Sequence, residues 1–345
     1  MPTQNRLTVR SFLALWALAT CASASAQVAP SCPTPPELPP SLGSVDYYTD
    51  AKHSVIDPEL QKRSEEQNRF LRDALYALGR MAEGGDRPQV LATQACALSW
   101  MEAWARRDAL ERVDKGGTVL QVVSAASLSL AYRTALALGK EAPREHLAVN
   151  RWLEQLATSI TRNEDMGRPG DQRNNVTYWA ALAAYNTSVV TGNRALSTWS
   201  REVYRQALAE IDNEGFFPSE LKRGQQALRY QWFAVTPLVT LYVTSHDKDG
   251  FRDEYSRARL AKAITAARAG LTNTAPMSRR AGTKVDAEGV SGYALTRVTQ
   301  RLADCVVSGT PSDNPASLTR DWRLGIGFRN LRCENHFDAL AAAAR

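Results

Sequence analysis

RALSTWSREVYRQALAEI, residues 194–211, shows the pattern from which the fold follows. Its apolar residues Leu196, Trp199, Val203 and Ala207 are spaced by three and four positions, which places them on one face of an α-helix. Similar segments recur along the chain, and the short breaks between them contain Gly, Pro, Asn or Asp. We therefore expect helices at 88–111, 118–139, 145–162, 174–191, 194–211, 226–245 and 251–269.

The remainder of the chain adds a helix at each end of this series. Asp57 followed by Pro58 is typical of a helix start, and Gly84-Gly85 marks its end. Residues 272–288 read as a loop, and 289–306 as a further helix. Alternating strand-like segments are nearly absent, so the fold class is all-α.

Helices of about 20 residues joined by short loops pack antiparallel to their neighbours. Seven or more in succession form hairpins, which can be arranged as a bundle, a solenoid or a ring. No strict repeat period is visible, which argues against a regular helical-repeat array. In each arrangement loop ends gather on one face, where a groove can form.

The N-terminus has the three parts of a secretory signal peptide, which we assign to residues 1–26. Arg6 and Arg10 precede an apolar run, and the small residues 24–26 provide a cleavage site. The apolar run is too short to anchor the chain in a bilayer. A lipoprotein would need attachment at Cys21, which the bulky preceding threonine disfavours.

After the signal peptide we expect export, and no later segment looks apolar enough to span a membrane. Residues 27–44 form a Pro-rich lead segment that cannot be helical and should lie along the surface. Residues 45–345 then form a single helical domain. The formal net charge of the whole chain, +6, fits an ordinary solvated surface or a basic groove for an anionic substrate.

Four cysteines remain in the exported chain, and an even number in an oxidising compartment suggests disulfides. Three pairings are possible, and we favour Cys32–Cys96 with Cys305–Cys333 because each closes a moderate loop. No CxxC or Cys/His ligand spacing is present, and the four histidines are widely scattered. The sequence therefore predicts no metal site.

Two segments place polar groups beside aromatic residues. The first is RNNVTYW at 173–179, and the second is ELKRGQQALRY at 220–230. If the second segment is helical throughout, Arg223 and Tyr230 lie on one face. Taken singly, each segment is equally well an ordinary helix start with polar caps.

Together the two segments fit proton abstraction next to a carboxylate. A phenol titrates near pH 10, so acting as a base at neutral pH requires about 4 kcal/mol of preferential phenolate stabilisation. A close guanidinium supplies part of this, and asparagine amides stabilise the charge that develops on a substrate carboxylate. This is the chemistry of β-elimination from a uronic acid polymer.

The order and spacing of these motifs resemble the alginate lyases of the helical-toroid type, the periplasmic poly-mannuronate lyases. The motifs are NNVTYW at 174–179 and the stretch from Glu220 to Val239, which includes RGQ, AL, Tyr230 and PLV. Further resemblance lies in YYTD at 47–50 and around 96–110, so it covers about residues 45–270. The resemblance implies an incomplete (α/α) toroid, an acidic polysaccharide substrate and a periplasmic monomer. It implies no cofactor, no metal, no nucleic acid and no membrane insertion.

The resemblance also assigns roles to residues of the two motifs. It implies that Tyr230 is the catalytic proton-transfer residue, assisted by Arg223 and Asn175. A groove lysine of the family falls near Lys52. The expected substrate-binding residues are Lys52, Asn174, Tyr178, Trp179, Gln225 and Arg229.

One position departs from the family: Val176 stands where the family has a histidine. In one interpretation Tyr230 is both base and acid, which is possible when the proton and the leaving oxygen lie on the same side of the ring, as in mannuronate. In the other, the protein is a catalytically lapsed relative that binds acidic exopolysaccharide. A third hypothesis, a glycoside hydrolase, needs two opposed carboxylates, for which the candidates are Asp212, Glu214, Glu220, Asp286 and Glu288.

Overall fold

The computed structural model describes residues 32–84, 87–163, 174–311, 319–334 and 336–337. The signal peptide expected at 1–26, and residues 27–31 of the lead segment, lie outside this range. The longer elements are α1 (Pro58–Gln67), α2 (Arg69–Glu83), α3 (Arg87–Ala105), α4 (Thr118–Gly139), α5 (Leu147–Arg162), α6 (Asn175–Thr191), α7 (Arg194–Glu210), α9 (Ala227–Thr244), α10 (Glu254–Gly270) and α12 (Ala294–Val307). The shorter ones are β1 (Ser41–Leu42), β2 (Arg112–Val113), α8 (Pro218–Leu221) and α11 (Ala275–Ala281).

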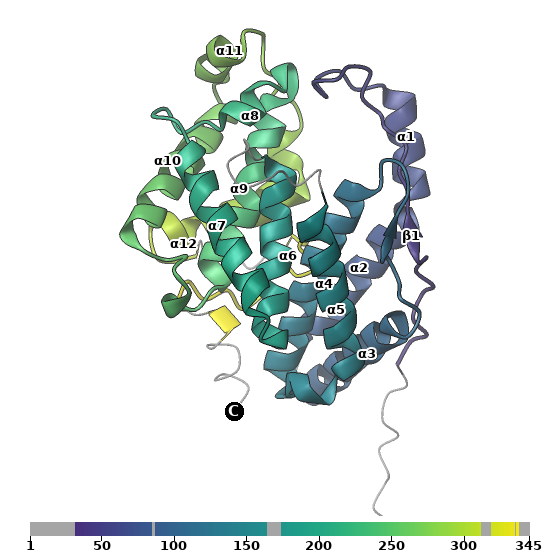
Figure 1. Ribbon diagram of the computed structural model, residues 1–345. Helices are drawn as coiled ribbons and strands as arrows, with labels where there is room; N and C mark the ends of the chain where they lie inside the picture. The colour runs from purple at the N-terminus through teal and green to yellow at the C-terminus, as the bar shows by residue number, and fades with distance from the viewer. Residues whose placement is uncertain (1–31, 85–86, 164–173, 312–318, 335, 338–345) are drawn as a thin grey trace, which may run out of the picture. The chain divides into compact units, whose positions relative to one another are not determined.

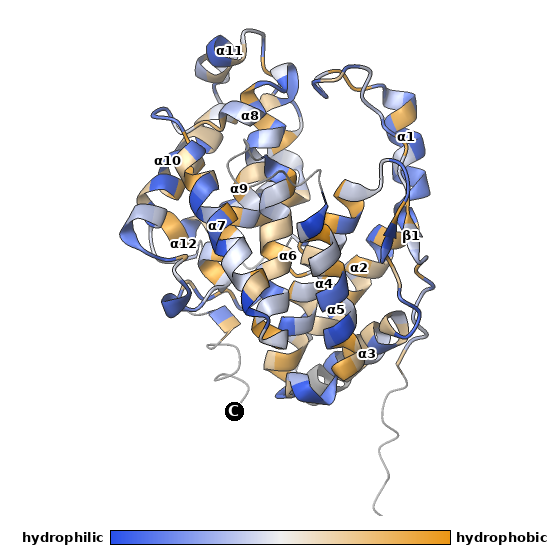
Figure 2. Ribbon diagram, viewed as in Figure 1, coloured by the Kyte–Doolittle hydropathy of each residue, from blue (hydrophilic) through white to orange (hydrophobic). Residues whose placement is uncertain are grey.

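The helices form two rows, one inside the other. In the inner row α2, α4, α6, α9 and α12 each pack against the next, and in the outer row α3, α5, α7 and α10 do the same. Helices α4, α6 and α9 are buried on nearly all sides, whereas α5 and α7 carry one apolar stripe and face solvent on the other (Figure 2). The expected all-α arrangement of helix hairpins is confirmed.

The helix boundaries differ from the sequence prediction in three places. The first predicted helix is two helices, because the Asn68 amide donates to the Ser64 carbonyl and breaks the run between α1 and α2. Helix α3 ends at Ala105, and Arg112–Val113 pairs instead with Ser41–Leu42 in a small parallel sheet. The loop expected at 272–288 contains the short helix α11, which has a proline in its first turn and ends at Gly282.

Helix α4 corrects the expectation that no later segment is apolar enough to cross a membrane. Its length and composition meet that requirement, but 83% of the apolar window is buried inside the protein. The apolar character of α4 reflects its central place in the inner row, where neighbouring helices cover it on several sides.

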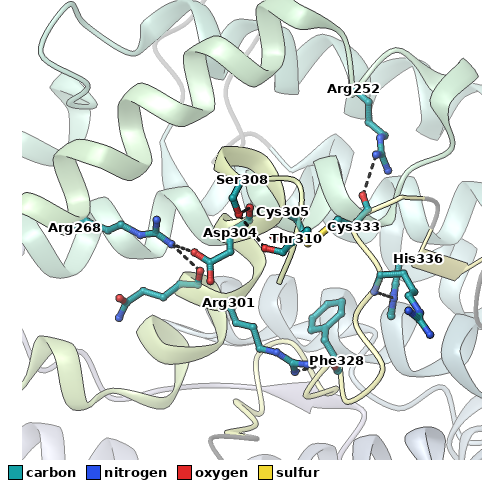
Figure 3. Close-up of a disulfide and its surroundings, with 12 residues drawn as sticks. Arg252, Arg268, Arg301, Asp304, Cys305, Ser308, Thr310, Phe328, Cys333 and His336 are labelled. Carbon is teal, nitrogen blue, oxygen red and sulfur yellow. Dashed lines mark hydrogen bonds and ion pairs between the residues drawn. A yellow bond between two sulfur atoms is a disulfide. The ribbon is translucent and has the colours of Figure 1, made fainter. Parts of the chain in front are cut away.

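Both predicted disulfides are present. The bond Cys32–Cys96 ties the lead segment to α3, and Cys305–Cys333 ties α12 to the C-terminal segment. Around the second bond, Arg252 donates to the Cys333 carbonyl (2.9 Å), as Figure 3 shows. Each disulfide therefore fixes a non-helical segment to a helix of the two rows.

The Pro-rich lead segment is extended, as predicted, and packs against α3. The indole nitrogens of Trp100 and Trp104 donate to the carbonyls of Pro33 (2.6 Å) and Pro36 (2.8 Å). These carbonyls lack helix or sheet partners, so the two buried tryptophans satisfy them. The i, i+4 tryptophan pair thus belongs to the core.

The C-terminal segment connects the two ends of the inner row. The buried carboxylate of Glu83, at the end of α2, accepts from Arg320 (2.8 Å), from the Gly327 amide (3.0 Å) and from the Arg329 amide (2.9 Å). The segment lies so close to α2 that a Cβ on Gly79 would lie 1.2 Å from the Gly325 carbonyl oxygen. Glycine at position 79 is therefore required by the close approach.

Candidate active site

The predicted site residues converge where α6, α8 and α9 begin, and Glu220 of α8 lies between them. Its carboxylate is buried and accepts from both the backbone amide (3.0 Å) and the side-chain amide (2.7 Å) of Asn175. The Arg223 guanidinium lies 3.8 Å from the same carboxylate. Glu220 therefore fixes the first residue of α6 against the turn before α9, which orients Asn175 and Arg223 together.

Tyr230, on the first turns of α9, completes this chain of contacts. The Arg223 guanidinium carbon lies 4.8 Å from the centre of the Tyr230 ring. The Tyr230 hydroxyl donates to the hydroxyl oxygen of Tyr48 at 2.8 Å. Although Gly224, at φ +56°, and a 3-10 turn interrupt the helix that the sequence suggested, Arg223 still lies beside Tyr230.

Tyr48 belongs to the loop before α1, which reaches toward α8 (Figure 1). The Asp50 carboxylate shapes this loop by accepting from the amides of Ser54 and Val55, both at 2.8 Å. Side chains of the turn before α9 hold it from the other side: Arg223 donates to the Lys52 carbonyl (3.3 Å) and Gln225 to the Ser54 carbonyl (2.8 Å). The loop is thus docked on the candidate site.

Burial controls the ionisation of the groups at this site. It raises the pKa of the Tyr230 phenol, while the hydrogen bond to Tyr48 and the charge of Arg223 act in the opposite direction. Burial also raises the pKa of Tyr48. The pKa of Glu220 is raised by burial, against the lowering effect of Arg223 and Asn175. Both phenols are therefore protonated at neutral pH in the protein without substrate.

The other residues expected to bind substrate have different surroundings. Asn174 caps α6 by accepting from the Val176 amide (2.9 Å), and Gln225 holds the docked loop. Arg229 lies over the ring of Tyr293 (4.7 Å from its centre) and donates to its hydroxyl. The Lys52 side chain is exposed beside the site, Gln225 is also exposed, and Arg229 is partly exposed.

Tyr178 and Trp179 are fully buried and support the site from within the core. The Tyr178 hydroxyl donates to Glu210 of α7 (2.9 Å). Trp179 donates from its indole to the Phe233 carbonyl (3.0 Å), which has no helix donor because Pro237, four residues on, lacks an N–H. Trp179 thus satisfies the backbone of α9 just after Tyr230.

Sequence reasoning did not assign a site role to Tyr48, Glu220 or Tyr293. Tyr48 lies in a sequence motif, but its contact with Tyr230 depends on how the loop before α1 docks. Glu220 was considered only as a candidate carboxylate of a glycoside hydrolase. A fully buried glutamate (1% exposed) at the start of a motif carries no periodic signal. Tyr293 lies beyond the region of resemblance and meets Arg229 through the packing of α9 against α12.

Four of the five carboxylates considered for a glycoside hydrolase make other contacts. Asp212 and Glu214 both pair with Arg280, and Glu220 is buried on Asn175 and Arg223. Asp286 accepts from the Glu288 amide in a local turn. In the described part of the chain, no group of three His, Cys, Asp or Glu side chains is placed to hold a metal ion.

The two rows of helices define an (α/α) toroid, and the site lies where inner helices begin. Comparison with solved structures gives the same fold. A variant of alginate lyase A1-III complexed with a tetrasaccharide matches with a TM-score of 0.61 at 19% identity, over 84% of this chain and 83% of that one. The Sphingomonas species A1 enzyme matches with a TM-score of 0.58 at 18% identity, over 84% of each chain.

Comparison of sequences gives the family. The alginate lyase family model matches residues 115–276. A polysaccharide lyase of Stenotrophomonas maltophilia is 30% identical over 229 residues, which are 63% of this chain and 66% of that protein. An alginate lyase of Pseudomonas aeruginosa is 30% identical over 223 residues, 61% of this chain and 60% of that protein. The match thus spans just under two thirds of these relatives, and together these findings support a member of the alginate lyase family.

Proposed function

We propose that this protein is a polysaccharide lyase that cleaves a mannuronate-rich, alginate-like polymer by β-elimination, with Tyr230 as the proton-transfer residue. The observation that carries the proposal is the continuous set of contacts from Asn175 through Glu220 and Arg223 to Tyr230. It joins a hydrogen-bond donor, a cation and a phenol, the three groups that elimination beside a carboxylate requires.

The proposed reaction breaks the C5–H bond and the bond from C4 to the glycosidic oxygen. Asn175 and Arg223 bind the substrate carboxylate and stabilise the negative charge that spreads into it as the C5 proton leaves for Tyr230. The electron pair forms the C4–C5 double bond. The departing oxygen then takes a proton from Tyr230, so that one residue is base and acid. Mannuronate suits this because both groups lie on one face of its ring.

Because the Tyr230 phenol is protonated in the free protein, substrate binding must favour loss of its proton. Burial raises the pKa of this phenol, and Arg223 and the hydrogen bond with Tyr48 oppose the increase. A polymer that excludes water from the site strengthens the attraction between the phenolate and Arg223. We infer that the phenolate forms as the polymer binds, with its proton released to solvent, and that the Tyr48 hydroxyl then donates to the phenolate oxygen.

An ultraviolet assay for the unsaturated product tests the proposal with mannuronate-rich, guluronate-rich and glucuronate polymers. Signal should appear first with the mannuronate-rich polymer. Tyr230→Phe should abolish it while circular dichroism and the melting temperature remain those of the wild type. Tyr76→Phe, which alters an exposed tyrosine of α2, is the matched control. Polymer cleaved without a new double bond would mean that the protein is not a lyase.

We propose that the protein acts in the periplasm or is secreted. The expected signal peptide supports export, and two disulfides support an oxidising compartment. The substrate proposed is an acidic polysaccharide of the cell exterior, and the protein is proposed to act as a monomer.

A second function, binding of acidic exopolysaccharide without cleavage, is favoured by one observation. Val176 packs against the apolar core next to Asn175 and can neither donate nor accept a proton. Val176→His distinguishes the two functions. A large gain of elimination activity in the variant supports a lapsed enzyme, and an unchanged rate supports the mechanism with Tyr230 alone.

A further inference from the structure

The docked loop brings His53 to the candidate site. The carbonyls on either side of it, those of Lys52 and Ser54, accept hydrogen bonds from Arg223 and Gln225. His53 itself has φ +52°, in the left-handed region, which is uncommon for a residue other than glycine. The loop therefore holds the His53 backbone in an unfavourable conformation against the turn that carries Arg223.

That conformation directs the His53 ring onto Tyr48. The two rings are stacked, with their centres 4.8 Å apart and their planes 5° from parallel, a favourable arrangement for aromatic rings. Tyr48 is the residue whose hydroxyl oxygen accepts the Tyr230 hydrogen bond. His53 thus contacts the ring that positions the hydrogen-bond partner of Tyr230.

The other histidines are placed elsewhere. Both ring nitrogens of His146 face carboxylates, those of Glu102 (2.9 Å) and Glu141 (3.1 Å). His336 is buried near the C-terminus, and His246 precedes the 3-10 turn after α9. Of the four histidines, all of them described, His53 is the one stacked against the tyrosine pair.

We propose that His53 is a positioning residue for Tyr230 that acts through Tyr48. Its ring, stacked on that of Tyr48, holds the Tyr48 hydroxyl against that of Tyr230. This inference rests on the proposed lyase function. It places an imidazole at the site from the loop before α1, whereas the position where the family has a histidine is occupied by Val176.

Aromatic and charged groups surround the stack on both sides. On its own loop, Tyr47 lies against Tyr48 (ring centres 4.6 Å apart), Lys52 is adjacent, and the Asp50 carboxylate is engaged by Ser54 and Val55. From the other side come the Arg223 cation and the Glu220 carboxylate, which lie within 3.8 Å of each other. Arg223 in turn lies over the Tyr230 ring, so the stack belongs to the contacts that surround Tyr230.

Two substitutions test the stack. His53→Ala removes the stacked ring, and kcat should fall about 10- to 100-fold, since the partner of Tyr230 is no longer held, while KM changes less than about 3-fold. His53→Phe keeps a stacked aromatic ring, so kcat should stay within about 3-fold of the wild type. His246→Phe is the control.

Nuclear magnetic resonance of the histidine ring protons gives a readout that does not depend on activity. The His53 resonances, identified by their loss in His53→Phe, should be shifted upfield by the Tyr48 ring and return toward normal in Tyr48→Leu. If the wild type shows no lyase activity but the shift is present, the proposed function fails while the His53 contact stands.

Three outcomes would overturn the inference. The first is a resonance without the ring shift. The second is His53→Ala with wild-type kcat. The third is His53→Phe with a kcat as low as that of His53→Ala.

Discussion

The substitution Glu220→Gln tests how the candidate site is held together. It keeps the size of the side chain and removes its charge. In the wild type both carboxylate oxygens accept from Asn175, at 3.0 Å from the backbone amide and 2.7 Å from the side-chain amide. A glutamine has one oxygen and one NH2 group, so one of these two donors faces another donor.

The size of the effect follows from that mismatch. A buried donor without an acceptor costs about 1–3 kcal/mol. The substitution also removes the attraction to Arg223, which lies 3.8 Å from the carboxylate. It equally removes the free-energy cost of burying the charge, the effect that raises the pKa of Glu220. These last two effects oppose each other, so we expect the free energy of unfolding to fall by about 1–3 kcal/mol. Displacement of Asn175 and Arg223 should lower kcat about 10- to 100-fold.

Urea unfolding and the ultraviolet elimination assay measure the two effects. Glu214→Gln, which alters an exposed carboxylate in the preceding loop, is the control and should leave kcat unchanged. KM for the polymer should also rise in Glu220→Gln, since Asn175 and Arg223 are proposed to bind the substrate carboxylate. A variant with wild-type kcat and an unfolding free energy within about 0.5 kcal/mol of the wild type would refute the assigned role of Glu220.

Three further predictions concern stability. Trp179→Phe leaves the Phe233 carbonyl without a donor and should lower the unfolding free energy by about 1–3 kcal/mol, measured by urea unfolding; an unchanged midpoint would contradict this. Burial lowers the pKa of His336 to about 3. The stability that the neutral imidazole contributes is therefore complete above pH 6.5, and the free energy of unfolding falls by about 1.4 kcal/mol per pH unit as the pH drops toward 3. His336→Gln should make the free energy of unfolding depend less on pH in this range, and an identical pH dependence would refute the assignment. Gly79→Ala would place a Cβ 1.2 Å from the Gly325 carbonyl oxygen and should lower the free energy of unfolding by about 1–3 kcal/mol. The melting temperature should fall, and an unaltered melting temperature would show that α2 and the C-terminal segment do not approach so closely.

Much of the fold was predictable from local patterns. The periodicity of residues 194–211 gave a helix that the structure has at Arg194–Glu210, and Asp57-Pro58 gave the start of α1, because spacing and capping are properties of a few neighbouring residues. Both disulfides followed from loop length. The break at Asn68 was missed because its cause, a side chain bonded to the Ser64 carbonyl, does not change the apolar pattern.

The candidate site was predictable in part. Arg223 and Tyr230 were named from their spacing, and they do lie together, although by a turn at Gly224 rather than along one continuous helix. Tyr178 and Trp179 were expected to meet substrate, but both are buried, because proximity to a motif in sequence does not say which way a side chain points.

The sequence by itself determined the helices, the favoured partners of the cysteines and the residues of the motifs, since each depends on spacing along the chain. Only the tertiary structure decided that Glu220 joins Asn175 to Arg223, and that a loop some 180 residues before Tyr230 delivers Tyr48 to it with His53 stacked behind. Those contacts depend on how the rows of helices pack and where the loops between them dock, which no local pattern encodes.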